Sequence, residues 1–270
     1  MQAYAVLNKK VGETPLALTE RFRKENPWIG DKKLAYAGRL DPMASGKLLV
    51  LIGDECKKQN KYLALDKEYT FEVLLGFSSD TGDVLGIATR DTNPPLITDS
   101  QLKDVTEKFT GNISMPFPAY SSKTVKGKPL FLWTLENKLA EITIPIKNSK
   151  IYKLSFRGTR TISAKEVHEK IFEKINSIPK VTETSKALGR DFRRKEIRER
   201  WNTLFAGTED DFQVVTFSCI ASSGTYMRSL AGEIGQALGT EGLAYSIHRT
   251  KIGRYKKLWK NIGIWYKKFT

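Results

Sequence analysis

One short stretch, residues 35–53, constrains the fold more than any other part of the chain. It reads Ala-Tyr-Ala-Gly-Arg-Leu-Asp-Pro-Met-Ala-Ser-Gly-Lys-Leu-Leu-Val-Leu-Ile-Gly. The five consecutive aliphatic residues 48–52 are enough for a strand buried on both faces and too few for a typical helix. Asp41 precedes this strand in a turn context, between Gly38 and Pro42. The stretch therefore predicts a carboxylate on a shaped loop that leads directly into the core.

Two interpretations of Asp41 are open at this point. Asp before Pro commonly begins a turn, because the carboxylate accepts hydrogen bonds from nearby backbone N–H groups. A carboxylate on a loop held by a rigid strand is also a common way to present a catalytic group. Local composition favours the turn, so the choice depends on the rest of the chain.

The composition indicates a globular protein with a polyanionic partner. The chain has 270 residues, of which 40% are hydrophobic, and this suits one large or two small domains with a sizeable core. The formal charge is +15 and the pI is about 9.6. A charge of this size favours nucleic acid as the partner, with an anionic membrane surface as the competing interpretation.

Several kinds of protein are disfavoured by the sequence. No apolar run approaches the ~18 residues that a membrane-spanning helix needs, and the first ten residues lack the pattern of a signal peptide. Cys56 and Cys219 are far apart, and neither His168 nor His248 has a neighbour that could share a metal ion. We therefore expect a cytoplasmic protein with reduced thiols, no metal site and no membrane association.

Alternation and capping signals predict a mixture of strands and helices. Residues 69–75 alternate apolar and polar side chains, as a half-buried strand does. Further strands are expected at residues 3–7, 48–52, 142–146, 151–156, 212–220 and 243–252. Helices are expected after cap residues at Thr14, Asp54, Thr98 and Ser163, and at residues 185–201 and 226–238.

Two segments are unusually basic. Residues 185–201 carry seven Lys and Arg against three acidic residues, which fits either a solvated helix face or one that faces RNA. From Arg249 to the end there are eight Lys and Arg, no acidic residue and several aromatic residues. This composition suits phosphate binding and base stacking, and it also suits a helix at a membrane surface.

Three motifs, taken in order, are more specific than any single residue. Residues 38–46 read Gly-Arg-Leu-Asp-Pro-Met-Ala-Ser-Gly, and residues 67–69 read Lys-Glu-Tyr. The second motif, which begins at 67–69, continues at residues 75–86 with the pattern Leu-Gly-x-x-Ser-Asp-Thr-x-Asp-x-x-Gly, and the third, residues 223–230, reads Ser-Gly-Thr-Tyr-Met-Arg-Ser-Leu. Together they resemble the TruB family of pseudouridine synthases, which isomerise a uridine in the T-loop of tRNA.

The resemblance implies an α/β fold of the α+β type, with a mixed, largely antiparallel central sheet, flanking helices and a basic cleft. It implies that the catalytic residues are Asp41, Tyr69 and Arg228. The residues expected to bind RNA are Lys9, Tyr36, Arg39, Tyr226 and Ile247. The reaction changes no oxidation state, so no cofactor is expected, and no metal.

The chemistry agrees with these assignments. A carboxylate can attack the sugar or the base, or remove a proton from the sugar, and the sequence leaves these three routes open. An ion pair with Arg228 would keep Asp41 ionised and oriented. Tyr69 can stack on the turned base and reach its proton with the phenol.

The chain also departs from the family pattern. Tyr36 stands where relatives usually have His, and Arg39 where they usually have a small residue. Residues 157–211 replace a much shorter connection, and the 17 residues after Gly253 are too few for the RNA-binding PUA-type domain of many relatives. We expect a catalytic domain at 1–156 and 212–253, a basic helical insertion at 157–211 and a basic-aromatic tail at 254–270.

The sequence therefore predicts a stand-alone pseudouridine synthase that modifies position 55 of tRNA. We expect it to be a monomer with RNA as its partner and no obligate protein partner. The insertion and the tail are expected to bind RNA in place of the PUA-type domain, so that removing 254–270 weakens tRNA binding. The alternatives are the same chemistry on another RNA, or a non-catalytic protein that binds or folds RNA.

Overall fold

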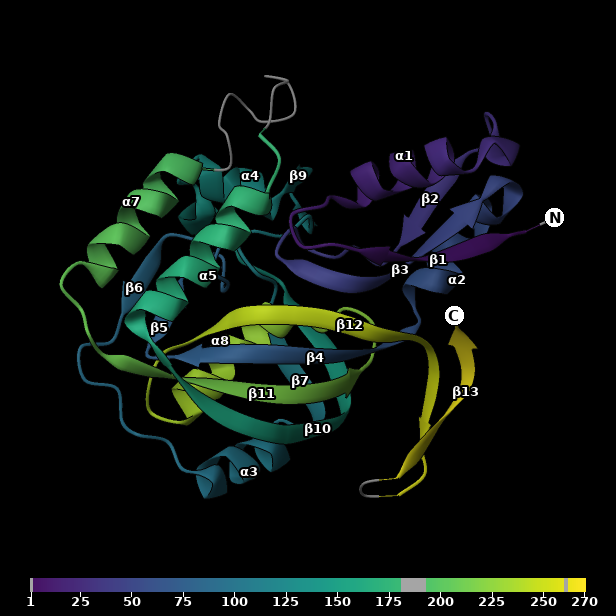
Figure 1. Ribbon diagram of the computed structural model, residues 1–270. Coiled ribbons are helices and arrows are strands. Elements are labelled where there is room, and N and C mark those ends of the chain that lie inside the picture. Colours follow the sequence, from purple (N-terminus) through teal and green to yellow (C-terminus); the bar gives the residue numbers. More distant parts are fainter. Residues whose placement is uncertain (1, 181–192, 260–261) are drawn as a thin grey trace.

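The computed structural model describes residues 2–180, 193–259 and 262–270, and its centre is one large sheet (Figure 1). The sheet has nine strands, in the order β1-β3-β12-β4-β11-β10-β7, with β2 added beside β3 and β13 beside β12. Its strands are β1 (Tyr4–Lys9), β2 (Leu34–Ala37), β3 (Ala44–Ile52), β4 (Asp66–Leu75), β7 (Gly111–Pro116), β10 (Ile146–Ser163), β11 (Asp211–Ala221), β12 (Gly242–Lys257) and β13 (Gly263–Phe269). Only the β3–β12 pair is parallel, so the expected mixed, largely antiparallel sheet is confirmed.

Helices and two small hairpins surround this sheet. The helices are α1 (Pro15–Glu25), α2 (Gln59–Leu63), α3 (Asp99–Lys108), α4 (Leu130–Leu135), α5 (Ala164–Ser177), α7 (Arg194–Phe205) and α8 (Met227–Ala237). Short 3-10 turns lie at η1 (Pro27–Ile29), η2 (Gly53–Lys58) and η3 (Leu139–Glu141). The hairpins are β5 (Phe77–Ser79) with β6 (Ala88–Arg90), and β8 (Thr124–Val125) with β9 (Lys128–Pro129). In Figure 1, α3 and the α5–α7 pair lie on opposite sides of the sheet.

Strand β3 is buried on both faces, as predicted. Leu49 and Leu51 pack into one hydrophobic cluster together with Phe269, while Val50 and Ile52 pack into another. Successive side chains of a strand point to opposite faces, so a continuous aliphatic run suits this position. The loop that carries Asp41 is therefore anchored to a strand with no exposed face.

The cap predictions are correct at three of the four positions. The side chains of Thr14, Thr98 and Ser163 each accept a backbone N–H at the start of their helices. Asp54 does not cap, because the chain passes from β3 into η2 without a side-chain cap and Asp54 pairs with Lys57 instead.

The strand expected at 151–156 is confirmed as part of one long strand, β10, whereas the strand expected at 142–146 is wrong because β10 begins only at Ile146. Its first part pairs with β7 up to Ile151, and its second part pairs with β11 from Ile151 to Ser163. Residues 147–150 are polar, and their side chains in β10 are exposed or partly buried, where polar side chains are tolerated. Residues 157–163, at the start of the expected helical insertion, therefore belong to β10 and to the central sheet.

Helix α7 extends beyond the predicted end at Trp201, and the predicted start at Ser185 lies outside the described residues. Trp201 is fully buried, and its indole Nε1 donates to the carbonyl oxygen of Val84 at 3.0 Å. Phe205 stacks on Trp201 and on Phe77. These contacts with the β5–β6 region stabilise an extra turn of the helix.

The basic-aromatic segment at the C-terminus is a β-hairpin. Residues 254–257 continue β12, and β13 returns antiparallel to it, so a helix is not formed here. Phe269 is 3% exposed and packs edge-on against Tyr4 and Tyr62. The last strand of the hairpin thus packs into the core through Phe269. Among the described residues, no helix has the length and apolar character needed to span a membrane.

Candidate active site

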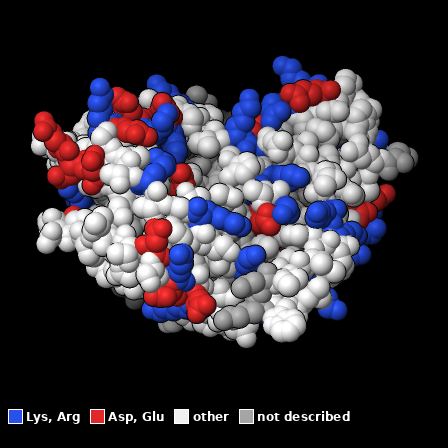
Figure 2. Space-filling view, turned by 60° about the horizontal axis from the view of Figure 1, so that its bottom comes forward, with Lys and Arg blue, Asp and Glu red and all other residues white. Residues whose placement is uncertain are grey.

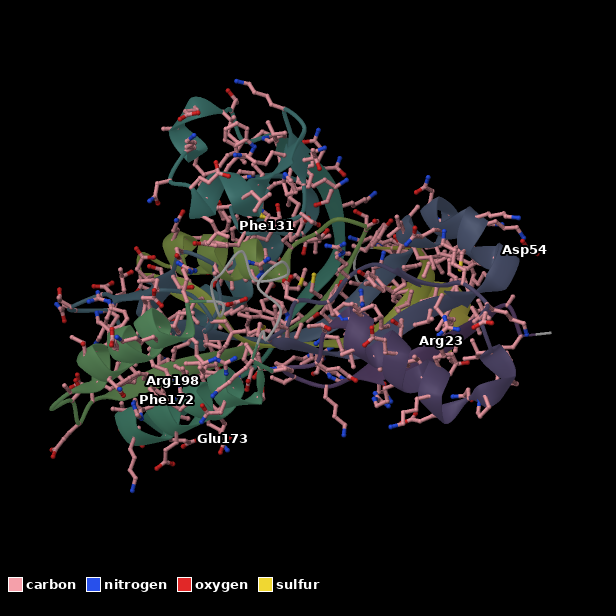
Figure 3. The ribbon with its side chains drawn as sticks, turned by 90° about the horizontal axis from the view of Figure 1, so that it is seen from above. Arg23, Asp54, Phe131, Phe172, Glu173 and Arg198 are labelled. Carbon is pink, nitrogen blue, oxygen red and sulfur yellow. The ribbon has the colours of Figure 1, made fainter. Side chains whose placement is uncertain are left out.

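A cavity of about 770 Å³ lies where the Asp41 loop meets the start of α8, the C-terminal end of α5 and the N-terminal end of α7. Figure 3 looks toward this side, with the α5–α7 pair at Phe172 and Arg198, α4 at Phe131 and α1 at Arg23. Six residues predicted from the sequence line the cavity: Arg39, Asp41, Tyr69, Tyr226, Arg228 and Ile247. The fold thus gathers residues from β4, β12, α8 and the loop before β3.

Asp41 and Arg228 form the predicted ion pair at the cavity wall. Arg228 Nε lies 2.8 Å from Asp41 Oδ2, and the Arg228 side chain is 5% exposed whereas that of Asp41 is 40% exposed. The remaining guanidinium nitrogens donate to the carbonyl oxygens of Thr81 and Tyr120. The arginine is therefore fixed by three partners, and it presents a carboxylate that stays open to the cavity.

Asp83 is a second carboxylate beside Arg228, to which the sequence analysis gave no role. Its Oδ2 lies 3.7 Å from Arg228 Nε, and its side chain is 6% exposed. Burial raises the pKa of Asp83, although Arg228 acts against this rise. Burial alone would lower the pKa of Arg228, but Asp41 and Asp83 together raise it. The arginine is thus held in its charged form.

Tyr69 lies beside Arg249, a buried cation that was counted only as part of the basic tail. Arg249 is the Cα partner of Tyr69 across the β4–β12 pair, and its guanidinium carbon lies 6.0 Å from the centre of the tyrosine ring. Burial raises the pKa of Tyr69, so its phenol keeps its proton at neutral pH. The sequence signal that could have identified Arg249 is its period-two spacing from Tyr245 and Ile247, which places it on their buried face.

Arg249 also holds the Asp41 loop at both ends. Its Nε donates to the carbonyl oxygen of Lys47 at 2.7 Å, and its Nη2 donates to that of Gly38 at 2.9 Å. Gly46 has φ +103°, and a Cβ there would lie 2.3 Å from the Arg249 carbonyl oxygen. Only glycine permits this approach of the loop to β12.

Lys9, which was expected to bind RNA, is buried and bonded to backbone carbonyl oxygens beside the Asp41 loop. It is 2% exposed, and its Nζ donates to the carbonyl oxygens of Glu13 at 2.6 Å and Lys10 at 2.9 Å. A longer bond of 3.4 Å reaches the carbonyl oxygen of Pro42. Burial lowers the pKa of Lys9 to about 8. An RNA contact is incompatible with this burial, which sequence spacing could not reveal.

Tyr36 does not line the cavity, whereas Arg39 does. The Arg39 guanidinium carbon lies 5.8 Å from the centre of the Tyr36 ring, within the range of a cation–π contact. The Tyr36 ring also packs partly against a small hydrophobic cluster that includes Val50. The two residues that depart from the family pattern therefore contact each other at the edge of the cavity.

The region 157–211 reaches the cavity through Arg193, the residue before α7. Arg193 pairs with Asp80, and its guanidinium lies 4.6 Å from the centre of the Tyr120 ring. The Tyr120 hydroxyl donates to Asp80 Oδ2 at 3.3 Å. Arg193 thus joins the two loops whose carbonyl oxygens hold Arg228. Sequence spacing gave no indication of this contact.

Lys67 is a buried lysine next to the Asp41 loop, and its burial should make the stability of the protein depend on pH. Burial and the nearby Arg249 lower the pKa of Lys67 to about 7. Above pH 7 the folded state loses this proton, while the unfolded chain keeps it to about pH 10.4. The unfolded state then binds more protons, so the free energy of unfolding of the wild type rises with pH.

Between pH 6.5 and pH 9.5, we expect the free energy of unfolding of the wild type to rise by about 3 kcal/mol more than that of Lys67→Met. Urea titrations of both proteins across this range measure it. The same comparison with Lys103→Met, which changes an exposed lysine of α3, should show no such difference. Parallel pH profiles for the wild type and Lys67→Met would contradict the prediction.

Comparison with known proteins agrees with this arrangement. The family model described as "TruB family pseudouridylate synthase (N terminal domain)" matches residues 27–171. The chain is 28% identical over 254 residues to tRNA pseudouridine synthase B of Syntrophus aciditrophicus, covering 94% of this chain and 63% of that protein. It is 38% identical over 156 residues to the protein of the same name from Caldanaerobacter subterraneus, covering 57% and 53%.

The chain thus spans less than two thirds of the length of these two relatives. Among solved structures, the crystal structure of a Cbf5-Nop10-Gar1 complex superposes with a TM-score of 0.54 at 19% identity. The match covers 93% of this chain and 49% of that chain, and it shows that the two share a fold. Because the family model matches more than half of the 270 residues, the protein belongs to the TruB family of pseudouridylate synthases.

Proposed function

We propose that this protein isomerises a uridine in RNA to pseudouridine, and that its substrate is the uridine at position 55 in the T-loop of tRNA. One observation carries the proposal: a carboxylate, Asp41, is ion-paired to a buried arginine and faces a cavity large enough for a nucleotide. Tyr69 lines the same cavity. A protein that only binds RNA has no need of a carboxylate directed at a polyanion.

The reaction breaks the bond between the sugar and the base nitrogen, turns the base and forms a carbon–carbon bond. Asp41 would supply the carboxylate for attack on the sugar or base, or for removal of a sugar proton. Arg228, whose Nε lies 2.8 Å from Asp41 Oδ2, would orient that carboxylate. Tyr69, which keeps its phenol proton, would stack on the turned base and donate a hydrogen bond. Electrons are only redistributed within the substrate, so the proposal needs no cofactor.

The uridine must leave its stack to reach Asp41, as for other enzymes that act on a base. Arg39 at the edge of the cavity could hold the displaced nucleotide, with Tyr36 supporting its guanidinium. The net charge of +15 attracts RNA over a longer range. Figure 2 shows Lys and Arg side chains across the middle and right of one face of the molecule. Under this proposal the protein works as a cytoplasmic monomer.

The test is to map pseudouridine in unmodified tRNA transcripts after incubation with the protein. We expect conversion of the T-loop uridine, and none in a transcript where cytidine replaces it. Conversion only at other positions, or only in other RNAs, would assign the same chemistry to a different substrate. Tight tRNA binding without any conversion would identify a non-catalytic RNA-binding protein.

A further inference from the structure

A second hollow of about 610 Å³ adjoins the cavity on the side of the C-terminal hairpin. Leu63 and Ser223 line both hollows. Ser223 Oγ donates to the carbonyl oxygen of Leu63 at 2.6 Å, so these two residues form one ridge between them. We call the second hollow the hairpin groove; its walls include Lys147, Tyr152, Arg254 and Tyr266.

The groove is basic on both of its sides. Lys147 comes from β10 and Arg254 from β12, and Arg254 Nη1 donates to the carbonyl oxygen of Ala64 at 3.4 Å. Asp66 is the single carboxylate among the described lining residues. It is 6% exposed, and it accepts bonds from the Tyr152 hydroxyl at 3.1 Å and the Tyr255 N–H at 2.9 Å. Those donors solvate the buried carboxylate, and the two cations outnumber it, so the groove is suited to an anion.

The hairpin directs an aromatic side chain to the groove. The pairing of β12 with β13 shifts between Arg254 and Tyr255, whose partners are Lys267 and Trp265. Tyr266 is the extra residue of this irregularity, and such bulges turn a side chain in a new direction. Its side chain is 63% exposed and lines the groove, while Trp265 packs against Tyr255. An exposed aromatic ring beside cations is the arrangement that stacks bases and binds phosphates.

Lys147 links the groove to the motif that carries Arg228. A Cβ on Gly224 would lie 2.4 Å from Cε of Lys147, so the lysine stem crosses the Ser223-Gly224-Thr225 turn directly. Gly224 itself lines the cavity. A chain bound in the cavity could therefore pass over the ridge and meet Lys147 first.

We propose that the hairpin groove binds the RNA strand that continues from the nucleotide in the cavity. Lys147 and Arg254 bind its phosphates, and Tyr266 stacks on a flanking base. This proposal rests on the proposed function only in taking the cavity as the uridine site. It gives the chain an RNA-binding surface outside the cavity, built from β10 and the C-terminal hairpin.

Removing residues 254–270 is a poor test, because it also removes Phe269 from the core. Substitutions in the groove avoid this difficulty. We suggest Arg254→Gln, Lys147→Gln with Arg254→Gln, and Tyr266→Ala. The matched control is Lys103→Gln with Lys165→Gln, which removes two exposed lysines that line neither hollow. Thermal melting establishes that each variant is folded.

The affinity of each protein is measured by fluorescence anisotropy at several salt concentrations, with two RNAs. One is the tRNA T-stem-loop, and the other is an oligonucleotide of the loop alone. For the stem-loop, we expect the double groove variant to bind about tenfold more weakly, with a salt slope reduced by about 0.7 for each lost phosphate contact. Tyr266→Ala should weaken binding without changing the slope. The loop oligonucleotide carries fewer nucleotides beyond the uridine, so its affinity should fall less in the groove variants than that of the stem-loop.

The outcomes separate this proposal from the proposed function. If the groove variants bind the stem-loop as tightly as the wild type does, the groove proposal is contradicted, even if pseudouridine is formed. An equal loss for both RNAs, or for the Lys103 and Lys165 control, also overturns it, because general charge would then explain the effect. A groove effect on binding without any pseudouridine would support the groove and contradict the catalytic proposal.

Discussion

Asp41→Asn is expected to lower the rate of pseudouridine formation by at least about a thousandfold, with tRNA binding nearly unchanged. The amide keeps the size of the side chain, and its oxygen can still accept from Arg228 Nε, which lies 2.8 Å from the carboxylate. It cannot act as a nucleophile or as a base. Single-turnover assays with tRNA transcripts measure the rate, and anisotropy measures the binding.

The matched control is Asp54→Asn, which changes an exposed aspartate paired with Lys57, remote from the cavity. It should retain full activity. Asp83 still faces Arg228 in this variant, and thermal melting establishes that Asp41→Asn is folded before the rates are compared. Activity of Asp41→Asn within about tenfold of the wild type would remove Asp41 from the chemistry.

The central ion pair could be predicted because each partner lies in its own short motif. Asp41 follows a loop signal and precedes an aliphatic strand, and Arg228 begins a helix whose apolar stripe is easily read. Their pairing itself was implied by the resemblance to the TruB family, because two distant motifs do not state a contact. The long strands β4, β11 and β12 were predicted for a similar reason, since their pattern is local.

The supporting residues could not be predicted in this way. Arg249 meets Tyr69 only because β12 pairs with β4 in one register, and a sequence does not state the pairing of distant strands. Arg193 reaches Asp80 from 113 residues away in the chain, and no local pattern predicts that contact. Lys9 was expected to contact RNA because of the family resemblance, and only the structure shows its three carbonyl partners.

Arg228→Met is expected to lower both activity and stability, the latter by about 3–5 kcal/mol. The substitution leaves Asp83, which is 6% exposed, without its cationic neighbour, and it removes the donors to Thr81 and Tyr120. Urea unfolding measures the loss. Arg157→Met, which changes an exposed arginine bonded to Ser218, should stay within about 0.5 kcal/mol of the wild type.

The loss should depend on pH in a defined direction. Burial already raises the pKa of Asp83, and removing the guanidinium that opposes this effect raises it further. The folded variant then holds a proton that the unfolded chain has released above its ordinary pKa of about 3.9. This contribution to stability is present at low pH and is lost as the pH rises through the folded-state pKa. The variant should therefore be closer to the wild type in stability at pH 5 than at pH 8.

A double variant distinguishes the two roles of the arginine. Adding Asp83→Asn to Arg228→Met removes the buried charge, while the Asn oxygen can still accept from Thr81 and from the N–H of Leu85. We expect most of the stability to return and its pH dependence to disappear. Activity should stay at least about a hundredfold low, because nothing then orients Asp41. If activity returned together with stability, Arg228 would serve the fold alone, and the ion pair would have no part in the chemistry.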